Sequence, residues 1–100
     1  MTTKLTPLAF ATLWLAACAV APVQEMSDAR QAIRSAEAAG ASQRSPDDFA
    51  ASQRLLLEAQ KRLKAGAYDT AKQFALEARD QAIRAREKAL QPGPAQFAPR

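Results

Sequence analysis

Leu63-Lys64-Ala65-Gly66-Ala67-Tyr68 is the stretch that decides the fold, because it places a glycine between two helical patterns. Glycine often follows the last turn of a helix, since it adopts the left-handed backbone conformation without strain. Downstream, alanine recurs at alternating three- and four-residue spacing at positions 71, 75, 78, 82, 85 and 89. This spacing predicts a helix over residues 68–90, with Phe74 beside the alanine row. We therefore expect two antiparallel helices joined by a tight turn.

The segment before the turn predicts a helix over residues 46–65. Its start is marked by Ser45-Pro46-Asp47-Asp48. Serine is a common capping residue, proline fits the first helical position, and acidic side chains favour the positive end of the helix dipole. One face of this helix carries apolar and small residues, namely Phe49, Ser52, Leu56, Ala59 and Leu63.

A third helix is predicted over residues 23–39, followed by Gly40 and a connector over residues 41–44. Met26, Ala29, Ile33 and Ala36 recur along it at helical spacing. No segment alternates as a strand does, so the fold class is all-α: a small antiparallel three-helix bundle over residues 23–90. The stretch Gln91-Pro92-Gly93-Pro94 ends the last helix, and we expect residues 91–100 to be a disordered tail.

The core of this bundle is expected to be thin. The chain has 100 residues, and 25 alanines supply much of its 48% hydrophobic content. Small domains bury little apolar surface and are marginally stable on their own. We therefore expect stabilisation from a partner, from self-association or from a membrane surface.

Residues 1–17 have the layout of a secretory signal peptide, with Lys4 before an apolar run. The run from Leu8 to Ala21 is shorter than the roughly 20 residues that a spanning helix needs. Leu15-Ala16-Ala17-Cys18 resembles the lipobox of bacterial lipoproteins at all four positions. The resemblance implies cleavage after Ala17 and acyl chains on Cys18, which would anchor the protein to a membrane through a tether of residues 18–22.

Two details qualify the anchor. Ala19, rather than aspartate, follows Cys18, which resembles the sorting signal for the outer membrane, with the domain on its periplasmic face. The alternative is an ordinary signal peptide with an incidental cysteine.

The composition argues against catalysis and nucleic-acid binding. The sequence has no histidine and one cysteine, so we expect no metal site, no cofactor and no enzymatic activity. Glu58 with Arg62 and Asp80 with Arg84 are spaced as helix-surface ion pairs. Loss of Lys4 with the leader lowers the net charge from +4 to +3, which is too small and too dispersed for a nucleic-acid partner.

A candidate interaction surface is more promising. Leu76, Ile83 and Leu90 repeat every seven residues, roughly 120° from the alanine row on a helical projection. Leu57 is similarly offset on the preceding helix. Lys72, Arg79 and Arg86 form a basic row between the two rows of the last helix. The apolar row either binds a partner or packs against the first helix.

The pattern resembles a known family, domain of unknown function 4398, over residues 29–89. The resemblance rests on Ala29-Arg30-Gln31-Ala32-Ile33, on Ala39-Gly40-Ala41, and on the Leu63 to Ala78 turn, which is also similar to the turn of a tetratricopeptide repeat. Members of the family are small bacterial envelope lipoproteins, some fused to an OmpA-like peptidoglycan-binding domain. The resemblance implies no catalytic residue.

These observations predict an outer-membrane, lipid-anchored lipoprotein that acts as a non-catalytic structural or protein-interaction module of the cell envelope. Its expected partners are the membrane, through Cys18, and an envelope protein or a second copy of the chain. One alternative is a pilotin-like assembly factor for an envelope protein. Another is a module that binds peptidoglycan or lipopolysaccharide through the basic row.

Overall fold

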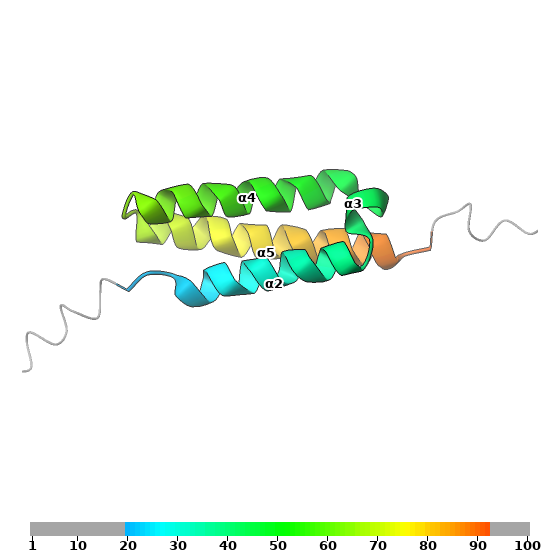
Figure 1. Cartoon of the computed structure of the whole chain (residues 1–100), viewed down its shortest axis with the longest axis horizontal. Helices are drawn as coiled ribbons and strands as arrows, with labels where there is room; N and C mark the ends of the chain where they lie inside the picture. Colours follow the sequence, from blue (N-terminus) through cyan, green and yellow to red (C-terminus); the bar gives the residue numbers. More distant parts are fainter. Residues whose placement is uncertain (1–19, 93–100) are drawn as a thin grey trace, which may run out of the picture.

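The computed structural model describes residues 20–92, which form an all-α domain (Figure 1). No strand is present within this range. The elements are α2 (Val23–Ala38), α3 (Ala41–Arg44), α4 (Pro46–Lys64) and α5 (Tyr68–Leu90). The three long helices form the predicted bundle, and the short α3 turns the chain between α2 and α4.

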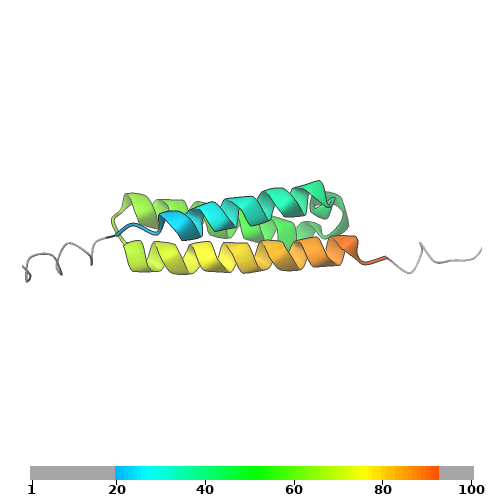
Figure 2. The ribbon, with the colours of Figure 1, turned by 90° about the horizontal axis from the view of Figure 1, so that it is seen from below.

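Helix α5 lies at the centre of the contacts between the helices. It packs along both α2 and α4, whereas α2 and α4 touch each other much less. Helices α2 and α5 run in the same direction and α4 runs against them, so the start of α2 lies at the same end as the α4–α5 turn (Figures 1 and 2). The opposite end holds α3, the start of α4 and the end of α5.

The core is built from alanine, as the sequence predicts. Among the described residues, the side chains with no exposed surface are Ser52 and ten alanines, including all six of the α5 row. Small side chains let helix axes approach closely, and the neighbouring helices leave no surface of the row exposed. Within residues 20–92, three larger apolar side chains are buried, and they are Met26, Ile33 and Phe49.

These residues gather in two clusters along the bundle. The cluster near the α4–α5 turn contains Met26 and Ala59, with Phe74 packed against it. The cluster near α3 contains Ile33 and Phe49. Leu56 packs against both clusters and so connects them.

The segment 41–44 differs from the expected connector, because it forms one turn of helix. Gly40 precedes it with φ +85°, a left-handed conformation that reverses the chain after α2. Ala41 is then wholly buried in the cluster near α3. Burial of this alanine draws the segment into the bundle, where a helical turn satisfies backbone groups that water would otherwise bind.

Ser45 occupies the position before α4, but its side chain does not cap that helix. The hydroxyl is buried and donates to the carbonyl oxygen of Ala85 at 2.6 Å. A hydroxyl has one proton to donate, and here the neighbouring helix provides the acceptor. The expected cap is therefore a link between α4 and α5.

Three further polar contacts join the end of α3 and the start of α4 to α5. The Arg44 guanidinium donates to the carbonyl oxygen of Ala89 at 3.1 Å, one of the last carbonyls of α5. Asp48 accepts from Gln81 at 2.8 Å and pairs with Lys88 at 2.7 Å. A positive group at a helix C-terminus and a negative group at an N-terminus each favour the helix dipole.

Candidate interaction face on α5

Leu76, Ile83 and Leu90 lie along one side of α5. Ile83 is 42% exposed and Leu90 is 54% exposed, while Leu76 is partly buried. Helix α2 therefore does not cover Ile83 or Leu90, although packing against it was the alternative role for this row. The reason is geometric: α2 covers the alanine row, and a second row roughly 120° around the helix projects past it.

The structure does not bring Leu57 together with this row. Leu57 is 55% exposed and follows Leu56, which packs on the core. At 100° per residue, Leu57 lies roughly 160° around α4 from the wholly buried Ala59. Leu57 therefore lies on the side of α4 that faces away from α5, apart from the row of Leu76, Ile83 and Leu90.

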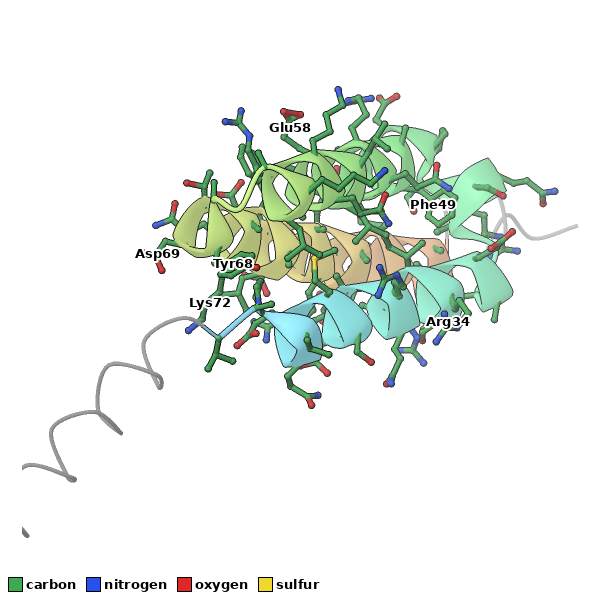
Figure 3. All side chains as sticks on the ribbon, turned by 60° about the vertical axis from the view of Figure 1, so that its left-hand side comes forward. Arg34, Phe49, Glu58, Tyr68, Asp69 and Lys72 are labelled. Carbon is green, nitrogen blue, oxygen red and sulfur yellow. The ribbon has the colours of Figure 1, made fainter. Side chains whose placement is uncertain are left out.

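The basic row divides into three environments. The ammonium of Lys72 lies 3.9 Å from the carboxylate of Glu25 on α2, and Figure 3 shows Lys72 beside the start of that helix. Arg79 donates to Asp80 at 2.8 Å. Arg86 is exposed and forms no ion pair among the described residues. Two of the three cations are thus already paired within the chain.

An acidic row that the sequence reasoning missed lies on the other side of the apolar row. Asp80 and Glu87 follow Leu76 and Ile83 by four residues each, and both are exposed. The signal was present in the sequence as a third seven-residue spacing, beside those of the apolar and basic rows. We use the name outer face for this surface of α5, which comprises Leu76, Ile83, Leu90, Arg79, Arg86, Asp80 and Glu87.

The remaining polar contacts of α4 and α5 are those of helix surfaces. The predicted pair of Arg62 with Glu58 is present at 3.3 Å. Asp80 pairs with Arg79 and not with Arg84, which donates to Gln81 instead. Arg62 also lies 5.4 Å from the ring centre of Phe74, a distance suited to a cation–π contact.

No group of three or more ligand-type side chains is placed to hold a metal ion within residues 20–92. In the same range, none of the helices combines the length and apolar character needed to cross a bilayer. The expected signal peptide, the Leu15-Ala16-Ala17-Cys18 motif and most of the expected tail fall outside the described residues.

Comparison with known proteins identifies one relationship. The family model described as "Domain of unknown function (DUF4398)" matches residues 24–92. This match runs from the first turn of α2 to just beyond the end of α5, so it covers the bundle and the outer face. No curated protein and no solved structure matches the chain.

Proposed function

Since this chain belongs to the DUF4398 family, whose function is unknown, we propose a role for it from its own motifs and surfaces. It is a lipoprotein anchored through Cys18 to the periplasmic face of the outer membrane. Its helical bundle is a non-catalytic module that binds an envelope protein or a second copy of the chain through the outer face.

The anchor is supported by the spacing between Cys18 and the bundle. Helix α2 begins at Val23, so four residues separate it from the proposed lipidated residue. Four extended residues reach about 14 Å, which holds that end of the bundle near the membrane surface. Val20 and Val23, each 71% exposed, lie there, and so does Tyr68 at the α4–α5 turn. Apolar and aromatic side chains suit a membrane interface.

The observation that carries the interaction role is the exposure of the outer face. Ile83 and Leu90 keep 42% and 54% of their surface exposed, in a chain whose buried core is mostly alanine. An exposed row of large apolar side chains rimmed by charged residues marks a surface that binds another protein. Direct binding of an anionic glycan is less well supported, because Lys72 and Arg79 already pair with carboxylates.

The anchor can be tested by replacing Cys18 with serine. Wild-type protein should incorporate a palmitate analogue and sediment with outer membranes, and Cys18→Ser should do neither. A control substitution of the same kind, Ser42→Ala in the exposed part of α3, should keep both properties. Labelling that persists in Cys18→Ser would show that lipid is attached elsewhere.

The interaction role can be tested with Ile83→Lys in the anchored protein. This change places a charge in the middle of the outer face, so it should abolish crosslinking to the bound protein while leaving the helical content unchanged. Loss of helicity would instead assign Ile83 to the core. Co-purification of one stoichiometric envelope protein would favour the assembly-factor role, and sedimentation with purified sacculi would favour peptidoglycan binding.

A further inference from the structure

The two charged rows of the outer face have opposite signs and similar offsets from the apolar row. Taking Ile83 as the reference, Arg79 and Arg86 lie roughly 40–60° to one side and Asp80 and Glu87 roughly 40–60° to the other. Positions at these offsets face the flanks of a partner helix in a two-helix contact, and their charges set its orientation. The charges of the outer face therefore determine the orientation in which a second copy can pack against it. This requirement is the charge rule.

That rule follows from symmetry. In a parallel pair, the two-fold axis runs along the helices, so the basic flank of one copy faces the acidic flank of the other. Arg79, which pairs with Asp80 of its own chain at 2.8 Å, then also lies opposite Asp80 of the second copy, and Arg86 lies opposite Glu87, each pair about 1.5 Å apart along the axis. In an antiparallel pair the axis is perpendicular to the helices, and like-charged flanks meet. Only the parallel arrangement is complementary.

We propose that two copies of this chain pair in parallel through their outer faces. The second copy is thus the protein partner of the surface assigned above, so the inference rests on the proposed function. Lipid anchoring imposes the same orientation, because two copies tethered at the start of α2 present that end to the same membrane. Charge pattern and anchoring geometry point independently to one arrangement.

The size of the face indicates a pair that depends on the membrane. A stable interface usually buries about 800 Å² on each partner. The outer face is one side of a single helix, about 34 Å long by its rise per residue, and is smaller than this. Confinement of both copies to one surface raises their effective concentration and offsets the small area. The pair should form on the membrane and dissociate in dilute solution.

Disulfide trapping in cells distinguishes the arrangements. In a parallel pair, residue 76 faces residue 76 and residue 90 faces residue 90. Leu76→Cys and Leu90→Cys, each expressed alone in the full chain, should both give disulfide-linked dimers. In an antiparallel pair centred on Ile83, residue 76 would face residue 90, roughly 21 Å from its own counterpart. Leu57→Cys is the matched control, since Leu57 and Leu90 are 55% and 54% exposed.

Charge reversal tests the rule itself. In the Leu76→Cys background, the double change Arg79→Glu and Arg86→Glu makes both flanks acidic and should lower the trapped fraction roughly tenfold, as about 1.4 kcal/mol would. Adding Asp80→Lys and Glu87→Lys exchanges the two flanks and should restore trapping. Failure of this restoration would overturn the charge rule.

The remaining outcomes are also decisive. Equal trapping of Leu57→Cys would mean random collision, and trapping only in a mixture of Leu76→Cys and Leu90→Cys would mean an antiparallel pair. Either result overturns the proposal. The parent protein separates failure of the anchor from failure of the pair: if it forms disulfides through Cys18, that thiol carries no lipid. In that case, increased trapping by Leu76→Cys over the parent still supports pairing, and no increase rejects it.

Discussion

At the scale of single residues, the alanine row of α5 leaves no room for larger side chains. Ala82 is wholly buried within the cluster near α3. Replacing it with leucine adds three carbon atoms to a packed contact, so we expect Ala82→Leu to lower the free energy of unfolding by about 1–3 kcal/mol. Urea denaturation measures this. Ala38→Leu makes the same change at an exposed alanine near the end of α2 and should be nearly neutral.

The turn residue Gly66 is constrained by its backbone alone. Its φ is +80°, and an added Cβ would meet no atom within 4 Å. Any loss on substitution must therefore come from the left-handed conformation, which costs roughly 1–2 kcal/mol for an ordinary residue. We expect Gly66→Ala to be destabilised by that amount and Gly66→Asn by less, because asparagine tolerates this region better. Equal losses, measured by thermal unfolding, would contradict the backbone explanation.

At the scale of elements, the α4–α5 contact is joined by polar groups at one end. Lys88 pairs with Asp48 at 2.7 Å, but its side chain is 61% exposed. Exposed pairs contribute at most about 1 kcal/mol, since water and salt screen them. A double-mutant cycle with Asp48→Ala and Lys88→Ala should give a coupling of about 0.5–1 kcal/mol that decreases at high salt.

The pair of Glu58 and Arg62 is the control for that cycle, because it lies within one helix and joins nothing across the bundle. Its coupling should be about 0.3–0.5 kcal/mol. A value as large as that of Asp48 with Lys88 would mean that the contact between helices adds nothing beyond local attraction.

The three long helices could be predicted from the sequence, because each depends on local signals, whereas the one-turn helix α3 was expected to be a connector. Spacing of the alanines located the buried side of α5, and glycines at positions 40 and 66 marked the ends of helices. Contacts between elements could not be predicted in this way. Ser45 has the sequence context of a cap, yet its hydroxyl bonds to Ala85, 40 positions away.

The same holds for the candidate interaction face: positions on a single helix could be predicted, and the packing of one helix against another could not. A projection of α5 alone places Ile83 and Leu90 away from the alanine row, and the structure leaves both exposed. The projection of α4 alone gives Leu57 a similar offset from the buried side of α4. It does not show whether Leu57 faces α5, α2 or solvent. The orientation of α4 about its axis is fixed by packing against α5, and this turns Leu57 outwards.

At the scale of the whole molecule, the thin core makes each long helix necessary. Native domains have about 0.05–0.15 kcal/mol of stability per residue, so a bundle of roughly 70 residues has about 4–11 kcal/mol. Helix α2 supplies Met26 and Ile33, two of the three larger apolar side chains that are buried in the described part of the chain. Burial of each contributes about 1.5–3 kcal/mol, a large part of that total.

A chain beginning at Gly40 should therefore fail to fold cooperatively. Without α2, the alanine row of α5 is covered on one side only, and the α4–α5 hairpin retains Phe49 as its one larger buried apolar residue. We expect circular dichroism to show a loss of most helical signal and a broad thermal transition. Adding a peptide of residues 20–39 should restore part of the signal, whereas the same peptide with Ile33→Asp should not. A sharp, unchanged transition without α2 would show that the α4–α5 hairpin folds on its own and that α2 is not needed for cooperative folding.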